Sequence, residues 1–176
     1  RAAVFENNGK VIVSFKGTDF SKMSDIKADY EQALDMRTNG APNAYYVRAQ
    51  EISKKIAVQQ LNNPSPPISA EYVGHSLGGG LASAAAAATG APATTFNAAG
   101  LNPNTVAGGM VGGPVKAVKV KGEILTGYLN KVPGLPDIHS TEVLAIDPAP
   151  SFGRDVVLPA LGGLIGFSWA SRVLGR

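Results

Sequence analysis

Three short stretches that follow one another without a break constrain the fold of this chain most strongly. Residues 68–73 predict a strand, residues 74–78 form a glycine-rich turn, and residues 77–89 are small and alanine-rich, which predicts a helix. Such small side chains let a helix pack very closely on a sheet, and Gly90 provides a residue that can end it. A strand that turns directly into a closely packed helix is a unit of α/β architecture.

The remaining stretches extend the same alternation. An Asn8-Gly9 pair between apolar runs at 2–5 and 11–15 predicts a hairpin, because both central residues of such a turn need a positive φ. The other expected elements are helices over 21–35 and 44–61 and strands over 93–97 and 115–120. The pattern therefore predicts an α/β fold with a mainly parallel sheet and helices on both faces.

The helix over 44–61 is expected to bury an apolar stripe of Tyr45, Ala49, Ile52 and Ile56, and residues 122–154 are expected to be mostly irregular. We expect residues 1–176 to form a single catalytic domain, cut from a longer chain. Residues 156–171 carry no charge, but the run is short and is interrupted by Pro159 and glycines, so it predicts a buried or interfacial helix rather than a membrane span.

The composition excludes several kinds of chemistry. The chain has no cysteine, which removes disulfides, thiolate zinc sites, iron–sulfur clusters and a cysteine nucleophile. It has only 2 histidines, which argues against a multi-histidine metal centre, and nothing in the sequence implies a metal or an organic cofactor. A net charge of +3 without a basic cluster among aromatic residues is too weak a signal for nucleic acid.

The turn between the predicted strand and helix reads Gly74-His75-Ser76-Leu77-Gly78, a G-x-S-x-G pattern. In a nucleophile elbow the serine sits on a strained turn, and the positions two before and two after it must lack a Cβ so that strand and helix can close up. The backbone N–H of Leu77 would then point at a developing oxyanion. The alternative is a glycine-rich turn whose serine only caps the helix.

Several segments together resemble the class 3 lipases of the α/β-hydrolase fold. These segments are GHSLGG at 74–79, VIVSFKGTD at 11–19 and TFNAAGL at 95–101, with a looser similarity in GEIL and HSTEVL at 122–125 and 139–144. Within that family the chain is most similar to lipase domains of secreted bacterial antibacterial effectors. The resemblance implies that Thr18 supplies a second oxyanion contact.

A serine hydroxyl needs a general base, and the chain offers two histidines for that role. His75 lies inside the elbow, and we expect its side chain to point away into the fold. His139 comes after the last predicted strand, which fits the chain order nucleophile, acid, histidine, so we predict His139 as the base. A base beyond Arg176 is the alternative that stays open.

The acid that orients the histidine should follow the strand over 115–120. Glu123 is the first carboxylate after that strand and matches the acid position of the resembled family, so we predict Glu123, with Asp137 as the alternative. The resulting triad is Ser76, His139 and Glu123.

The predicted function is a serine carboxylic-ester hydrolase that acts on lipid esters, as a lipase or phospholipase, at a membrane surface. The alternatives are an esterase or thioesterase for other substrates, and a membrane-active or partner-binding module on an inactive hydrolase scaffold. The resemblance to effector domains further implies delivery by a bacterial secretion system and an inhibitor (immunity-type) protein as a partner.

Overall fold

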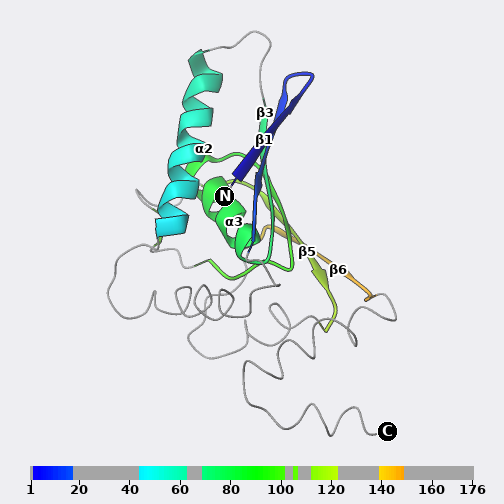
Figure 1. The fold of residues 1–176 in the computed structure, drawn as a ribbon. Helices are drawn as coiled ribbons and strands as arrows, with labels where there is room; N and C mark the ends of the chain where they lie inside the picture. Colours follow the sequence, from blue (N-terminus) through cyan, green and yellow to red (C-terminus); the bar gives the residue numbers. More distant parts are fainter. Residues whose placement is uncertain are drawn as a thin grey trace, which may run out of the picture.

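The fold is a six-stranded sheet with two helices, seen in a computed structural model that describes residues 2–17, 44–62, 69–101, 105–106, 112–122 and 139–148 (Figure 1). The strands lie side by side in sequence order, and all neighbours are parallel except the first pair. The elements are β1 (Ala2–Asn7), β2 (Lys10–Phe15), α2 (Ala44–Asn62), β3 (Ser69–His75), α3 (Leu77–Thr89), β4 (Ala93–Phe96), β5 (Val115–Val120) and β6 (Glu142–Ile146). This arrangement confirms the predicted α/β fold.

The β1–β2 hairpin forms as the sequence predicts. Asn8 and Gly9 adopt φ values of 50° and 77°, and Asn7 pairs with Lys10 across the turn. Asparagine and glycine tolerate this left-handed conformation better than other residues, so the register of the antiparallel pair is fixed locally.

The five parallel strands give the sheet two different edges. The carboxyl ends of β2, β3 and β4 meet at one edge, where Phe15 pairs with Gly74 and His75 pairs with Phe96. We call this edge the carboxyl edge and the opposite one the amino edge. In parallel α/β sheets, ligands bind beyond the carboxyl ends of the strands, so the carboxyl edge is where a site is expected.

Helix α3 packs on β2, β3 and β4, and α2 packs on α3, so both helices of the described part lie on one face of the sheet (Figure 1). The predicted helices on the other face are not seen among the described residues. The predicted boundaries of α3 are confirmed, and Gly90 ends it with a φ of 79°. Two predicted segments lie outside the described residues: the helix over 21–35 and the apolar run at 156–171. The described residues also cover only part of the single domain predicted over 1–176.

The predicted apolar stripe of α2 is wrong by about one residue. Tyr45 and Ile52 are 45% and 37% exposed, and the buried side is formed by Tyr46, Ala49, Gln50 and Ser53. The polar members of this side find their own partners, because Gln50 Nε2 donates to Thr105 O at 2.7 Å and Ser53 Oγ donates to Ala49 O at 2.8 Å. A stripe chosen by hydrophobicity alone misses buried polar residues that are satisfied in this way.

Strand β6 is an element that the sequence did not predict within residues 122–154, of which the structure describes only 122 and 139–148. It runs parallel to β5 at the end of the sheet, and all five of its residues are exposed. An exposed strand lacks the alternation of buried and solvated side chains that identifies strands from sequence. No helix in the part of the chain that the structure describes is long and apolar enough to cross a membrane.

Candidate active site

Ser76 occupies the sharp turn between β3 and α3. Its φ and ψ are 57° and −125°, and it is only 6% exposed. A positive φ in a residue other than glycine costs on the order of 1–3 kcal/mol and must be enforced by the surrounding structure. The Ser76 side chain makes no capping hydrogen bond to α3, which contradicts the alternative that this serine only caps the helix.

The glycines around Ser76 let strand and helix approach each other, as predicted. A Cβ at Gly74 would overlap the backbone of Gly78, and a Cβ at Gly78 would overlap the carbonyl oxygen of Phe15. A Cβ at Gly79 would lie 2.6 Å from the Cβ of Ala98. The end of β2, the elbow and the segment after β4 are therefore in direct contact around Ser76.

Hydrogen bonds hold the backbone of Ser76 on both sides. Its N–H donates to Phe96 O at 3.0 Å, and its carbonyl accepts from Ala99 N at 3.0 Å. The same carbonyl accepts from Gly79 N and Gly80 N, at 2.9 Å and 3.3 Å, which starts the helix. The turn is thus anchored to β4 and to α3, and this anchoring can enforce the strained φ.

Of the two predicted oxyanion contacts, Leu77 lies within the described residues and Thr18 does not. Leu77 is the first residue of α3, and N–H groups in the first turn have no acceptor within the helix. Gly17 lies against the elbow, because a Cβ there would be 2.5 Å from His75 O and 3.5 Å from Ser76 Cβ. Thr18 itself lies outside the described residues.

The expectation that His75 points into the fold is wrong, because its side chain is exposed. It is the last residue of β3 and pairs with Phe96, which is 41% exposed. Along β3 the buried residues Ala70, Tyr72 and Gly74 alternate with this more open side, where His75 lies.

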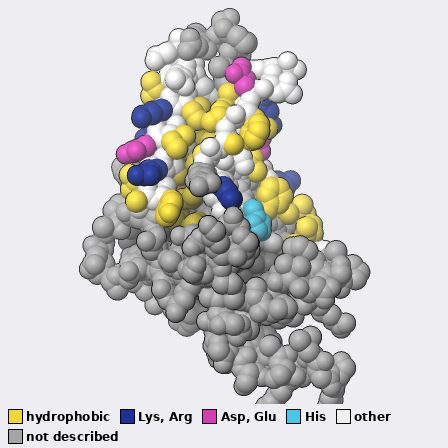
Figure 2. All heavy atoms as spheres, in the orientation of Figure 1, with side chains coloured by type: hydrophobic (Ala, Val, Ile, Leu, Met, Phe, Trp, Pro, Cys, Tyr) yellow, Lys and Arg dark blue, Asp and Glu magenta, His cyan; other side chains and the backbone are white. Residues whose placement is uncertain are grey.

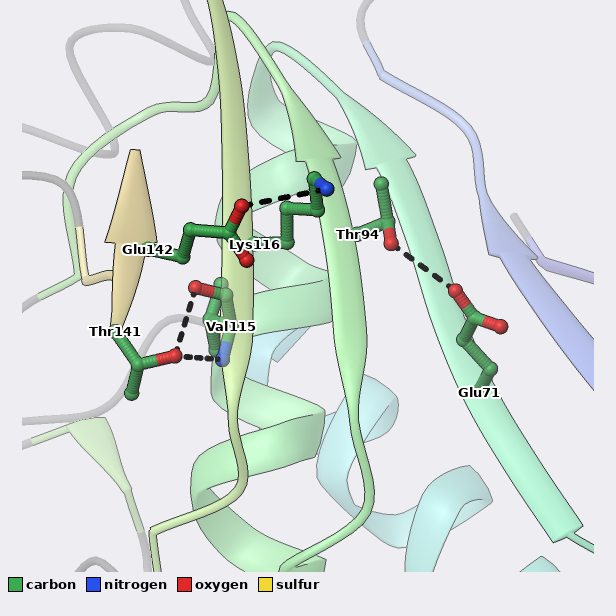
Figure 3. A network of polar contacts seen from close by, with 6 residues as sticks. All are labelled: Glu71, Thr94, Val115, Lys116, Thr141 and Glu142. Carbon is green, nitrogen blue, oxygen red and sulfur yellow. Dashed lines mark hydrogen bonds and ion pairs between the residues drawn. The ribbon is translucent and has the colours of Figure 1, made fainter. Parts of the chain in front are cut away.

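His139 lies at the amino edge. The residue two positions after it, Thr141, is bonded to the first residue of β5: Thr141 N and Thr141 Oγ1 donate to Val115 O at 2.9 Å and 3.1 Å, and Val115 N donates to Thr141 Oγ1 at 3.0 Å (Figure 3). The Nε2 atom of His139 is buried and has no hydrogen-bond partner in the described structure. Burial lowers the pKa of His139.

The structure does not bring Ser76 and His139 together. Tyr72, Val115 and Thr141 lie in one row across the sheet, and Ser76 follows Tyr72 by four residues toward the carboxyl edge. At about 3.3 Å per residue and about 4.8 Å between strands, the Cα atoms of Ser76 and Thr141 are roughly 19 Å apart. A nucleophile and its base must be within about 3 Å.

The reason for this separation is β6. A strand parallel to β5 must start at the amino edge, so the chain returns there after leaving β5. His139 lies three residues before the start of β6 and is therefore placed at the amino edge, whereas an irregular segment could have stayed near Ser76.

Both predicted acids, Glu123 and Asp137, lie outside the described residues. The last described residue before Glu123 is Gly122, which follows the end of β5 with a φ of 77°. Lys121 N donates to Ile146 O at 2.8 Å, so the turn after β5 starts at the carboxyl edge.

Asn97, directly after β4, joins the site although the sequence reading gave it no role. It is 8% exposed, has a φ of 41°, and accepts a hydrogen bond from Val120 N through Oδ1 at 2.8 Å. The sequence signal was an asparagine at the end of a predicted strand, which tolerates a left-handed φ.

Comparison with known proteins identifies a family for most of the chain. The family model described as a Tle-like phospholipase domain matches residues 1–142. A search of curated proteins found no significant match. Within the described residues, no group of three or more histidine, aspartate or glutamate side chains is placed to hold a metal ion.

Proposed function

The chain belongs to the family of Tle-like phospholipase domains, and on that premise we propose that it cleaves phospholipid esters with Ser76 as the nucleophile. The family supports the class of reaction, hydrolysis of a lipid ester. The observation that carries the mechanism is the elbow, because Ser76 has a strained φ of 57°, lies at the carboxyl edge and heads a helix without capping it. Strain of this kind persists where function requires it.

The proposed reaction has two steps. Ser76 Oγ attacks the ester carbonyl while a base takes its proton, and the oxyanion is stabilised by the backbone N–H groups of Leu77 and Thr18. The alcohol leaves with the proton from the base, and water then hydrolyses the acyl-enzyme in the same way. Glu123 is the proposed acid of the triad.

The general base is the open part of this proposal. His139 stays the prediction from chain order, but its place at the amino edge gives that prediction no support. His139 can act as the base only if the segment before β6 takes a different path in the active protein. The assignment of Ser76 does not depend on how this is resolved.

Labelling with a fluorophosphonate probe, alongside hydrolysis of phosphatidylglycerol vesicles, tests the proposal. We expect the native chain to be labelled and active, and Ser76→Ala to lose both properties. Ser83→Ala is the matched control, because Ser83 Oγ is buried in α3 without a hydrogen-bond partner in the described structure. Vesicle disruption that survives Ser76→Ala would instead support a membrane-active module on an inactive scaffold.

The same assay decides the base. If His139→Ala abolishes labelling, His139 is the base and the segment before β6 differs in the active protein. If His139→Ala is labelled like the native chain, the amino-edge position holds and the base lies elsewhere.

The biological setting is proposed from the family and the resemblance. We propose that the domain is delivered as a bacterial secreted effector, acts on phospholipid membranes and is inhibited by an immunity-type protein. Hydrolysis of short-chain esters in preference to vesicles would point to the alternative, an esterase or thioesterase.

A further inference from the structure

Asn97 connects two strands at the carboxyl edge. Its backbone N–H donates to Val118 O at 2.9 Å, and its Oδ1 accepts from Val120 N at 2.8 Å. It therefore contacts the last residues of strand β5 at two points, Val118 and Val120. A left-handed φ of 41° places both groups of Asn97 toward β5, and asparagine accepts that conformation more readily than most residues.

The residues beside Asn97 hold the elbow. Phe96 O accepts from Ser76 N, and Ala99 N donates to Ser76 O, both at 3.0 Å. Ala98 packs against Gly79, because a Cβ added at Gly79 would lie 2.6 Å from the Cβ of Ala98. Phe96 and Ala99 thus hydrogen-bond to the backbone of Ser76, while Asn97, between them, hydrogen-bonds to β5.

The end of β5 leads to the proposed acid. Val120, whose N–H bonds to Asn97, is three residues before Glu123, and the turn at Lys121 and Gly122 lies between them. Removing the Asn97 side chain would deprive the part-buried Val120 N–H of this hydrogen bond, which costs free energy. The start of the turn at Lys121 and Gly122 is therefore fixed by Asn97, the residue whose neighbours hold the elbow.

We propose that Asn97 is a positioning residue that fixes the turn at Lys121 and Gly122, which leads in the sequence to Glu123, relative to Ser76. The inference rests on the proposed function, because it assumes the roles given there to Ser76 and Glu123. Asn97 acts through these residues and does not itself contact the substrate.

The test compares turnover of a soluble p-nitrophenyl ester by Asn97→Gly in the native and Glu123→Gln backgrounds. Glycine keeps the positive φ and the backbone bond to Val118, so the change removes the side chain and with it the Oδ1 acceptor for Val120 N–H. Because a misplacement of about 1 Å can cost about 100-fold, we expect kcat to fall about 10- to 100-fold while KM changes little. In the Glu123→Gln background we expect almost no further loss, since the acid no longer needs to be placed.

Two variants sharpen the comparison. Asn97→Asp keeps an acceptor for Val120 N–H and should restore most of kcat. Asn8→Gly makes the same change at another left-handed asparagine, at φ 50° in the β1–β2 turn, and should leave kcat as in the native chain. Thermal unfolding shows which variants are folded, and Asn97→Ser, whose hydroxyl falls short of β5, replaces Asn97→Gly if that variant unfolds.

The outcomes separate the two proposals. An unchanged kcat in Asn97→Gly, or an equal loss in both backgrounds, would overturn the positioning role while Ser76 remains the nucleophile. Turnover that survives Ser76→Ala would overturn the proposed function itself.

Discussion

Ser76 carries backbone strain that serves chemistry rather than stability, and this can be measured. Glycine adopts a φ of 57° without steric strain, whereas alanine or serine at this φ lowers the stability of the folded state. We therefore expect Ser76→Gly to be more stable to urea than Ser76→Ala, by about 1 kcal/mol, with both variants inactive toward the fluorophosphonate probe. A glycine variant that unfolds at lower urea than the alanine variant would mean that the elbow stores no strain.

Glu71 is the residue whose charge should matter most to stability within the described sheet. Its carboxylate pairs with Lys10 Nζ at 2.7 Å. It also accepts a hydrogen bond from Thr94 Oγ1 at 3.0 Å (Figure 3). The hydrogen bond from Lys10 is the main cause that lowers the pKa of Glu71.

The sign of the resulting pH dependence follows from this shift. The folded state releases the Glu71 proton more readily than the unfolded state, so the contribution is complete above the ordinary glutamate range and lost as pH falls through the lowered pKa. We expect Glu71→Gln to cost about 1 kcal/mol at neutral pH and nothing in strong acid, measured by urea unfolding across pH. An equal cost at both pH values would show that charge plays no part.

At the scale of elements, the elbow was predictable and the position of His139 was not, for different physical reasons. The contacts of Gly74 and Gly78 are local and steric, so the pattern of glycines determines the turn, and the helix from Leu77 begins where expected. The position of His139 depends on whether β6 forms, because one added parallel strand moves the preceding residue to the other edge. Alternation could not reveal β6, whose side chains are exposed on both faces.

The closeness of β3 and α3 gives a prediction about two glycines. A Cβ at Gly74 would overlap the backbone of Gly78, which cannot move aside, whereas a Cβ at Gly112 would meet nothing within 4 Å. Gly112 has a φ of 85°, so an alanine there suffers only conformational strain, on the order of 1 kcal/mol. We expect Gly74→Ala to cost about 3 kcal/mol or more and Gly112→Ala clearly less, by thermal or urea unfolding. Similar costs would mean that the strand and helix can separate without penalty.

For the whole molecule, the sheet separates the proposed chemistry from the residues that only stabilise the fold. Ser76, Gly17 and Asn97 lie at the carboxyl edge, where Asn97 also contacts the end of β5. The contacts between Thr141 and Val115 lie at the amino edge. Variants at the carboxyl edge should therefore change turnover, and variants of Thr141 or Val115 at the amino edge should mainly change stability.

The surface of α2 suits the proposed approach to an anionic membrane. Arg48, Lys54 and Lys55 are exposed on it against the single acid Glu51, and basic side chains lie beside hydrophobic ones on the face drawn in Figure 2. The exposed Tyr45 is on the same helix. A basic residue near an anionic surface contributes about 1 kcal/mol to binding, and salt screens this contribution.

We expect Lys55→Glu to weaken binding to phosphatidylglycerol vesicles about tenfold at low salt, since it removes one favourable charge and adds one unfavourable charge. Lys116→Glu makes the same change of net charge on β5, where Lys116 Nζ is paired with Glu142 at 3.3 Å, and should weaken binding less. Fluorophosphonate labelling should be unaffected by either change, because neither residue is near the elbow. Vesicle co-sedimentation at low and high salt measures the effect: an equal loss in both variants would mean that net charge alone matters, and no loss in Lys55→Glu would show that α2 does not face the membrane.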